Sequence, residues 1–321
     1  MKIAITGGAG FLGKKLARTL LDDNALAVEE LVLADMVEAP EELAGDSRVR
    51  SIVGDVTDED LLADAIRADT DSVFHLAAVV SAGAEADFDL GMAVNLDATR
   101  TILEIARKHG NLPKLVFSSS CAVYGGDLPD VVSDNQQITP QNSYGVQKAI
   151  GELLVNDYAR KGYVDGRSLR YPTVVVRPGK PNKAASTFAS SIIREPLQGD
   201  EAVCPVAPET EMWLASPRTI VANTRHAHDL DGSAFGPWRT VPLPGFTATV
   251  RGMVDALEAV AGPEVAARVK WQPDAAIEKI VYGWPSRLET TRADAMGFKR
   301  DTDMQSIIRA FIEDELGGKI A

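Results

Sequence analysis

Near its start the chain reads Thr6-Gly7-Gly8-Ala9-Gly10-Phe11-Leu12-Gly13, a glycine-rich loop between a short apolar run and a helical pattern. The preceding run, Lys2 to Thr6, predicts a buried strand. Gly7 permits a tight turn, Gly10 lets a phosphate group approach the backbone, and Gly13 lets the following helix pack close to the sheet. A strand, a glycine loop and a helix in this order indicate a site for a dinucleotide pyrophosphate at the helix N-terminus.

The next apolar run ends in an acid at a suitable distance. Leu31 to Ala34 is closed by Asp35, 22 residues after Gly13. A carboxylate there accepts both ribose hydroxyls of NAD and repels the extra phosphate of NADP. The alternative is an acid that merely ends a strand, but Met36-Val37-Glu38 also offers no arginine, so NAD is favoured. Asp55, after the third run, suits the adenine amino group, although a turn acid explains it nearly as well.

The first half of the chain alternates buried strands with amphipathic helices, a pattern typical of a parallel sheet covered on both faces. We therefore expect an α/β fold, a doubly wound parallel sheet of the Rossmann type with a smaller C-terminal substrate-binding lobe. The dinucleotide domain is predicted over 1–177, with segments from about 216–245 returning to it. The smaller lobe is predicted mainly over 178–321, where proline, serine and glycine become frequent.

Composition excludes several classes of protein. The 321 residues carry a net charge of −13, which argues against nucleic acid or an anionic membrane surface as the main partner. The two cysteines, Cys121 and Cys204, stand far apart without metal-ligand spacing, so we expect neither a disulfide scaffold nor a metal site. The strand begins at Lys2 and no long apolar run follows, so a cytoplasmic protein is expected.

A reactive set lies further along the chain. Tyr144 and Lys148 stand four residues apart and share one helix face, where the cation lowers the pKa of the phenol. The run Ser118-Ser119-Ser120 ends a predicted strand at the carboxyl edge of the sheet, where open α/β proteins bind ligands. A serine hydroxyl there can hold a substrate oxygen beside the phenol.

Together these features resemble the extended branch of the short-chain dehydrogenase/reductase superfamily, over the whole chain. That branch carries TGxxGxxG, here Thr6 to Gly13, and YxxxK, here Tyr144 and Lys148. Ser119 to Gly125 matches its SSxxxYG pattern. The resemblance implies Ser120 as the catalytic serine and Tyr144 as the acid/base. It implies that Lys148 binds the nicotinamide ribose and tunes the tyrosine.

The resemblance also implies the cofactor contacts. His75 to Ala78 matches the segment that runs beside the cofactor through its backbone, and we interpret His75 itself as structural because it ends an apolar strand. Asn95 matches the helix asparagine of the branch, with a polar helix-surface residue as the alternative. The predicted NAD-binding residues are Gly7, Gly10, Phe11, Leu12, Gly13, Asp35, Asp55, Val56, Leu76, Ala77, Asn95, Tyr144 and Lys148.

A closer similarity is to the sugar-acid dehydrogenases of this branch. Their uronate-oxidising members place a serine shortly after the HLxx segment, as Ser81 does here, and an arginine where this chain has Lys183. The stretches 171–182, 194–197 and 213–218 resemble members that oxidise the C2 hydroxyl of D-erythronate, a four-carbon sugar acid, with NAD. The implied substrate-binding residues are Ser81, Ser120, Tyr144 and Lys183.

Several alternatives stay open. Lys183 is equally well explained as a solvated loop lysine, and Arg177 and Arg218 are the other cations that could bind a carboxylate. A nucleotide-sugar epimerase is the first alternative function, although 196–217 lacks the lysines and arginines that would clamp a diphosphate. A non-catalytic NAD-binding sensor or scaffold is the second. By resemblance, the helices around 95–108 and 143–160 suggest a homodimer.

Overall fold

The structure is a computed structural model, and it describes residues 1–179 and 185–321. Its internal contacts divide the chain into two compact units, each built from three segments. Unit 1 contains Met1–Val123, Pro140–Arg170 and Val221–Pro242. Unit 2 contains Tyr124–Thr139, Tyr171–Ile220 and Leu243–Ala321. The expected domain boundaries stay a prediction, and they did not include 124–139 in the second unit.

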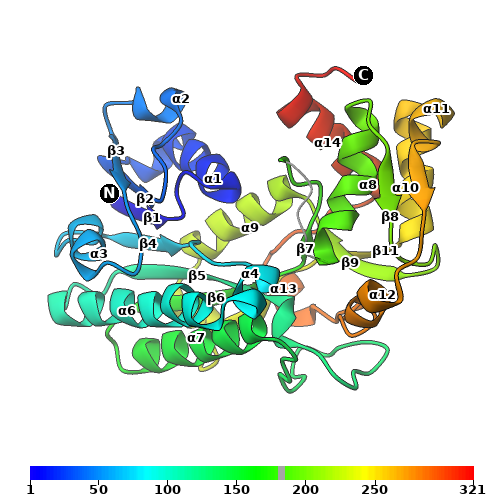
Figure 1. The fold of residues 1–321 in the computed structure, drawn as a ribbon. Coiled ribbons are helices and arrows are strands. Elements are labelled where there is room, and N and C mark those ends of the chain that lie inside the picture. Colours follow the sequence, from blue (N-terminus) through cyan, green and yellow to red (C-terminus); the bar gives the residue numbers. More distant parts are fainter. Residues whose placement is uncertain (180–184) are drawn as a thin grey trace. The chain divides into compact units, whose positions relative to one another are not determined.

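A seven-stranded sheet forms the centre of unit 1 (Figure 1). Its order is β10-β6-β5-β4-β1-β2-β3. The strands are β1 (Lys2–Thr6), β2 (Glu30–Asp35), β3 (Val49–Val53), β4 (Ser72–His75), β5 (Lys114–Ser120), β6 (Asp165–Tyr171) and β10 (Thr240–Pro242). The registers are parallel, as the doubly wound prediction requires. Because the strand order reverses between β1 and β4, ligands are expected at the carboxyl ends of these two strands.

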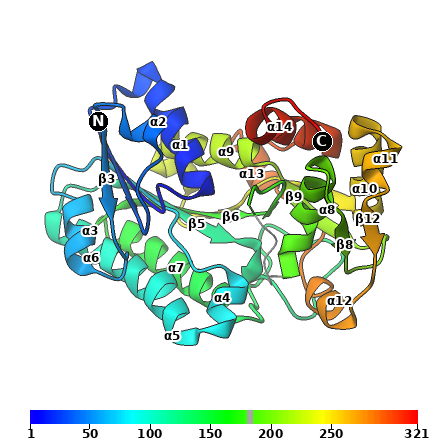
Figure 2. The same ribbon diagram turned by 45° about the horizontal axis from the view of Figure 1, so that its top comes forward.

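Helices cover both faces of this sheet (Figure 2). One face carries α1 (Phe11–Asp22), α2 (Glu41–Ala44) and the part of α9 (Pro217–Asp229) that belongs to unit 1. The other carries α3 (Glu59–Ala65), α6 (Ala98–His109) and α7 (Ser143–Arg160), whose apolar sides pack on alternate strand residues such as Val32 and Val73. This double cover explains why the strands are apolar throughout.

Short elements connect these layers. A 3₁₀ turn follows α1 at Asn24–Leu26, and another follows β5 at Cys121–Val123. After β4 come α4 (Ser81–Ala86) and α5 (Phe88–Gly91), and Met92–Asp97 then forms a π-helical turn. The helix expected around 95–108 therefore begins with this turn. A last 3₁₀ turn spans Gly232–Phe235.

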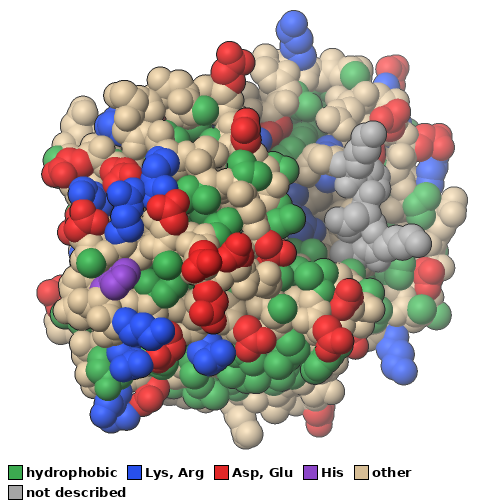
Figure 3. Space-filling view, turned by 60° about the vertical axis from the view of Figure 1, so that its left-hand side comes forward, with side chains coloured by type: hydrophobic (Ala, Val, Ile, Leu, Met, Phe, Trp, Pro, Cys, Tyr) green, Lys and Arg blue, Asp and Glu red, His purple; other side chains and the backbone are tan. Residues whose placement is uncertain are grey.

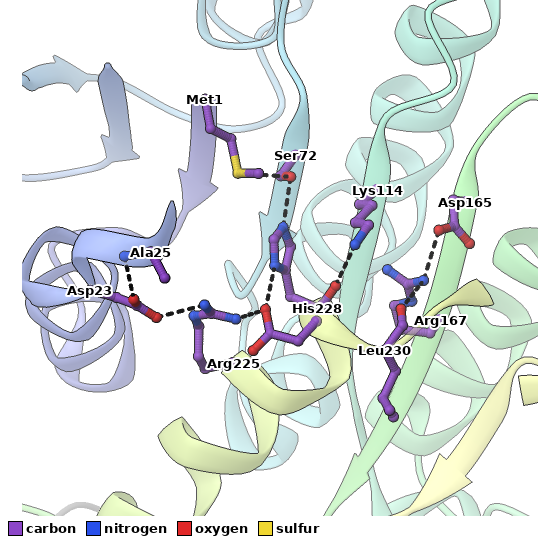
Figure 4. A network of polar contacts seen from close by, with 11 residues as sticks. Met1, Asp23, Ala25, Ser72, Lys114, Asp165, Arg167, Arg225, His228 and Leu230 are labelled. Atoms are coloured by element: carbon purple, nitrogen blue, oxygen red, sulfur yellow. Dashed lines mark hydrogen bonds and ion pairs between the residues drawn. The ribbon is translucent and has the colours of Figure 1, made fainter. Parts of the chain in front are cut away.

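A buried polar network ties the end of α9 to the amino ends of the strands (Figure 4). His228 Nε2 lies 2.8 Å from Ser72 Oγ at the start of β4. Lys114 Nζ, at the start of β5, donates to the His228 carbonyl oxygen at 2.8 Å. Arg225 pairs with Asp23 beyond the end of α1 at 2.6 Å. These bonds fix the sheet edge opposite the predicted ligand edge.

Unit 2 has two small sheets and its own apolar core. The three-stranded sheet has the order β11 (Phe246–Thr249), β9 (Glu211–Ala215), β7 (Thr173–Val174), and β8 (Ala202–Cys204) pairs with β12 (Val269–Trp271). Its helical elements are a 3₁₀ turn at Ala185–Thr187, α8 (Phe188–Leu197), α10 (Val250–Ala261), α11 (Pro263–Ala266), α12 (Ala275–Val281), α13 (Thr291–Ala295) and α14 (Met304–Leu316). The core joins α8, α10 and α14 through residues such as Ile192, Leu257 and Ile308.

Two features are absent from the described residues. No helix there is long and apolar enough to cross a bilayer. No group of three or more His, Cys, Asp or Glu side chains there is arranged to hold a metal ion. On the face seen in Figure 3, lysines and arginines lie among aspartates and glutamates rather than in a separate stripe.

Candidate active site

The glycine loop between β1 and α1 is packed against backbone on two sides. Gly7 has a φ of 73°, and a Cβ there would lie 2.8 Å from the Ala77 nitrogen. A Cβ on Gly13 would lie 2.1 Å from the Gly7 carbonyl oxygen, so only glycine fits. Helix α1 begins with no side-chain cap and no acid in its first turn. Its amide groups therefore suit an anion such as a pyrophosphate.

Asp35, at the end of β2, accepts a hydrogen bond from the backbone of this loop. Its Oδ2 accepts a bond from the Ala9 amide at 3.0 Å, and its Oδ1 accepts one from the Met36 amide at 2.7 Å. The half-buried Asp55 accepts a bond from the Thr57 amide at 2.9 Å, which is a turn geometry. Other predicted cofactor residues, Phe11 and Leu12, are half-buried, and Val56 is buried.

The end of β4 is fixed by a neutral histidine. His75 Nδ1 lies 2.7 Å from Thr6 Oγ1, and its Nε2 lies 2.9 Å from Thr99 Oγ1. Burial, with the positive charge of Lys148 adding to it, lowers the pKa of His75 to about 3. The structural interpretation of His75 is confirmed by these contacts. Leu76 continues the strand by donating its amide to the Thr6 carbonyl oxygen at 3.0 Å.

Both the oxygen and the nitrogen of the Asn95 side-chain amide are hydrogen-bonded within the protein. Its Oδ1 accepts a bond from the Val79 amide, and its Nδ2 donates to the Val79 carbonyl and to Gln147 Oε1, all within 2.9 Å. The side chain is 1% exposed, so it is not the polar helix-surface residue given as the alternative. It joins the segment after β4 to α7.

The three serines at the end of β5 differ in burial: two are buried and hydrogen-bonded within the protein, and one is half-buried. Ser118 Oγ donates to the His75 carbonyl at 3.0 Å, and Ser119 Oγ donates to Glu152 Oε1 at 2.5 Å; both serines are buried. Ser120 is half-buried, and its Oγ accepts a bond from the Ala122 amide at 3.1 Å. Ser120 is therefore the serine of the run that retains exposure.

Helix α7 comes very close to the end of β5. A Cβ on Gly145 would lie 2.2 Å from the Ala122 carbonyl oxygen, just past Ser120. A Cβ on Gly151 would lie 2.7 Å from the ring of Phe117 on β5. Asn142 Oδ1 caps the helix by accepting a bond from the Gly145 amide at 2.8 Å. This close approach brings the first turn of α7 to the serine.

Tyr144 and Lys148 occupy that part of α7. Tyr144 is half-buried, while Lys148 is 1% exposed. The Lys148 ammonium lies 5.8 Å from the centre of the Tyr144 ring and 4.6 Å from that of Phe117. Burial lowers the pKa of Lys148 to about 7, and the negative charge of Glu152 opposes that shift. The arrangement places a cation beside a phenol and so can favour the phenolate.

The structure describes some, but not all, of the predicted substrate-binding residues. Ser81 is half-buried at the first position of α4, and Lys183 lies outside the described residues. The half-buried Arg177, in unit 2, has its Nη2 3.4 Å from Ser186 Oγ. Its carbonyl oxygen accepts a bond from Arg194 Nη1 at 2.7 Å.

Arg218 is the expected carboxylate cation that the structure argues against. Its guanidinium pairs with Glu313 at 2.9 Å and Asp314 at 2.5 Å on α14, and the bonds to these acids raise its pKa. These two acids also explain why an arginine is tolerated in the first turn of α9, where the helix dipole disfavours a cation.

Glu152 and the two glycines of α7 were not among the residues predicted from the sequence. Glu152 lies four residues after Lys148, so the spacing Tyr-x₃-Lys-x₃-Glu was a visible signal for a third group on one helix face. Gly145 and Gly151 gave no such signal, because a helix glycine reveals its partner only when the opposing backbone is known.

Comparison with known proteins identifies the family. The model of the NAD dependent epimerase/dehydratase family matches residues 3–213. The chain belongs to this family. Because the family is NAD dependent and the glycine loop, uncapped helix and Asp35 fit a dinucleotide, NAD is the cofactor of this protein.

Relatives in this epimerase/dehydratase family include two named enzymes. A D-erythronate dehydrogenase of Cupriavidus necator is 55% identical over 98% of this chain and 98% of its own length. Another, of Haemophilus influenzae, is 49% identical over 98% of this chain and 100% of its own. Among solved structures, one described as a nucleoside-diphosphate-sugar epimerase of Agrobacterium tumefaciens has a TM-score of 0.95 and 43% identity. That match covers 100% of this chain and 96% of the other.

Proposed function

We propose that this protein is an NAD-dependent dehydrogenase that oxidises the C2 hydroxyl of D-erythronate to the 2-oxo acid. The observation that carries the proposal is the similarity to two D-erythronate dehydrogenases, at 55% and 49% identity over nearly the whole of each chain. The relatives' names give no support to a catalytically silent NAD sensor. The pairing of Tyr144 with Lys148 supports an oxidation, because it provides a general base for a hydroxyl proton.

In this proposal Tyr144 accepts the proton of the C2 hydroxyl on its phenolate oxygen. Lys148 favours that phenolate through its buried positive charge. Ser120 holds the reacting oxygen with its half-buried hydroxyl. NAD, when bound, supplies the carbon that accepts the hydride. One C–H and one O–H bond of the substrate break, a C=O bond forms, and the proton stays on Tyr144.

The loop after β1 would hold the cofactor, with Gly7, Gly10 and Gly13 admitting the pyrophosphate. Asp35 would accept the adenosine ribose hydroxyls, while Asp55 would face the adenine. Supporting contacts come from Phe11, Leu12, Val56, Leu76 and Ala77. We assign Asn95 to positioning of the segment after β4, since its amide is fully used by Val79 and Gln147.

The substrate carboxylate needs a cation. With Arg218 held by two acids, Lys183 and Arg177 are the proposed candidates, and Ser81 is proposed to bind a hydroxyl. Replacing each cation by Ala separates them, since the one that binds the carboxylate should raise KM for D-erythronate while KM for NAD stays unchanged.

A nucleotide-sugar epimerase is the second candidate, favoured by the description of the solved Agrobacterium structure. An epimerase returns the hydride to its substrate, so it releases no net NADH. The lack of lysine and arginine over 196–217 weighs against a diphosphate clamp. Isomerisation of a UDP-sugar with tightly retained NAD would favour this candidate.

We further propose a homodimer and a cytoplasmic location. On α7, Val146 and Leu153 are 41% and 53% exposed and lie on one stripe, seven residues apart. Phe88 and Leu90, both in the neighbouring helix α5, are exposed as well. Such apolar surface is consistent with a second copy as partner. Sedimentation of the wild type and of Leu153→Glu tests the dimer.

The decisive experiment measures NADH absorbance with purified protein, NAD and a panel of D-erythronate, L-threonate, glycerate, glucuronate and a UDP-sugar. We expect NADH with D-erythronate. Tyr144→Phe should bind NAD as the wild type does and lose turnover. Turnover retained in Tyr144→Phe would refute the assignment of the base, and no NADH with any acid would refute the proposed dehydrogenase.

A further inference from the structure

Behind Tyr144 and Lys148 lies a buried charged cluster that the proposed chemistry does not use. Glu152 is fully buried on α7, and Arg170 near the end of β6 is 3% exposed. Arg170 Nε donates to Glu152 Oε1 at 2.9 Å, and its Nη2 donates to Oε2 at 2.7 Å. Ser119 donates to the same Oε1 at 2.5 Å. All these residues belong to unit 1.

The cluster stands beside an ammonium group that lacks a close partner. Among the described residues, no hydrogen bond or ion pair reaches Lys148 Nζ, and its contacts are the rings of Phe117 and Tyr144. A buried ammonium without a counter-charge loses its proton, because desolvation penalises the charged form. Among the described acids, Glu152 is the one whose charge favours the ammonium.

The other titratable or charged groups around Lys148 do not replace Glu152. Tyr144, on the same helix, favours the ammonium only as a phenolate. His75, across on β4, stays neutral because its pKa is about 3. Cys121, next to β5, stays a thiol because burial raises its pKa to about 12. Arg170 on β6 is bound to the Glu152 carboxylate.

We propose that Glu152 is a positioning residue that keeps Lys148 protonated and, through Ser119, fixes the strand end that carries Ser120. The inference deepens the proposed function, since it rests on the role given there to Lys148. Glu152 and Lys148 are four residues apart on one face of α7, so the carboxylate faces the ammonium along the helix. Arg170 holds both carboxylate oxygens, which prevents the carboxylate from turning onto Lys148 and closing a direct ion pair.

This arrangement predicts that substitutions of Glu152 and of Arg170 shift the pKa of Lys148 in opposite directions. Removing the negative charge of Glu152 lowers the pKa of Lys148, because burial of the ammonium is then no longer opposed by this carboxylate. Removing the positive charge of Arg170 raises the pKa of Lys148, because it frees Glu152 to pair with the ammonium. A purely structural role for the pair would not predict opposite signs.

The test titrates Lys148 in the whole protein by NMR of ¹³C-labelled lysine, with the signal assigned by its loss in Lys148→Met. In Glu152→Gln the Lys148 midpoint should fall by about one pH unit or more, a tenfold or larger loss in proton affinity. In Arg170→Met it should rise. Glu152→Asp, which keeps the charge, should restore most of the wild-type midpoint. Asp157→Asn, an exposed change on the same helix, is the matched control and should leave the midpoint unchanged.

The pH profile of kcat/KM provides the second measurement. In Glu152→Gln the loss of activity at alkaline pH should begin at lower pH, whereas the profile of Asp157→Asn should match the wild type. A Lys148 midpoint that is the same in Glu152→Gln and wild type would overturn the proposal, as would shifts of equal sign in the Glu152 and Arg170 variants. If Glu152→Gln fails to fold, Arg170→Met and Glu152→Asp still decide the sign. Because the titration requires no turnover, failure of the proposed function leaves this test intact.

Discussion

Two edges of one sheet treat their buried cations in opposite ways. At the amino edge, Lys114 is bonded to the His228 carbonyl, and Arg167 to Asp165 and the Leu230 carbonyl (Figure 4). At the carboxyl edge, Lys148 is buried against two rings with its counter-charge one helical turn away. Burial lowers the pKa of both lysines. The difference teaches that the cations of the amino edge are bonded to the end of α9, whereas Lys148 at the carboxyl edge has no direct hydrogen bond to any described residue and fits the role proposed for it beside Tyr144.

The two histidines that flank β4 repeat this division. His228 contacts Ser72 at the start of the strand, and His75 lies at its end between Thr6 and Thr99. Burial, reinforced by nearby positive charges, lowers the pKa of each to about 3. Both histidines are therefore neutral and serve as hydrogen-bonding partners within the structure. Neither is a candidate acid or base at neutral pH.

The largest expected effect comes from exchanging the two lysines in turn. Lys148→Met should lower kcat/KM for D-erythronate by roughly 10²–10⁴-fold, because the phenolate loses its cation. Lys114→Met should leave kcat/KM within a few-fold of wild type and cost about 1–3 kcal/mol of unfolding free energy, because a buried carbonyl loses its donor. Steady-state kinetics and urea unfolding of both variants check this. Equal losses of activity would break the comparison between the edges.

The next largest effect concerns the close contact between Gly145 on α7 and the Ala122 carbonyl oxygen after β5. Gly145→Ala places a methyl group 2.2 Å from the Ala122 carbonyl oxygen, so the first turn of α7 must move away from Ser120. We expect a stability loss of about 1–3 kcal/mol together with a lower kcat. Gly283→Ala, where the nearest atom lies at an ordinary 3.5 Å, is the matched control. Wild-type kcat in Gly145→Ala would contradict the importance of this contact.

The smallest effect is a pH dependence of stability set by the neutral histidines. A histidine whose folded pKa is about 3 binds a proton in the unfolded chain first, so stability is full above about pH 6.5 and falls as the pH drops toward 3. His228→Asn should reduce that slope by about 1 kcal/mol per pH unit. Chemical unfolding between pH 4.5 and 6.5 measures it, with the exposed His109→Asn as control. An unchanged slope would mean that His228 is charged in the folded protein.

Sequence alone accounts for the sheet and for the loop that follows β1. The apolar runs at Lys2 to Thr6 and Leu31 to Ala34 predicted β1 and β2 to within one residue at each end. These features are local, since strand burial and glycine spacing depend on neighbours in the chain. The doubly wound fold follows from such local patterns.

The parts that could not be predicted depend on contacts between distant segments. Which serine of the run stays exposed depends on Glu152 and on the His75 carbonyl, 33 and 43 residues away from their serines. Arg218 looked free in the sequence because its partners lie about 95 residues later. The role of Asn95 likewise became clear only from its bonds to Val79 and Gln147.

The spacing of Tyr144, Lys148 and Glu152 has a consequence for how the gene can vary. Each step of four residues advances the helix by about 6 Å and turns it by only about 40°, so a single face delivers all three groups. Inserting or deleting one residue between 144 and 152 would turn everything beyond it by about 100°. Natural variants should therefore keep the length of this nine-residue window fixed. Length changes should collect instead at exposed turns such as the one around Gly162.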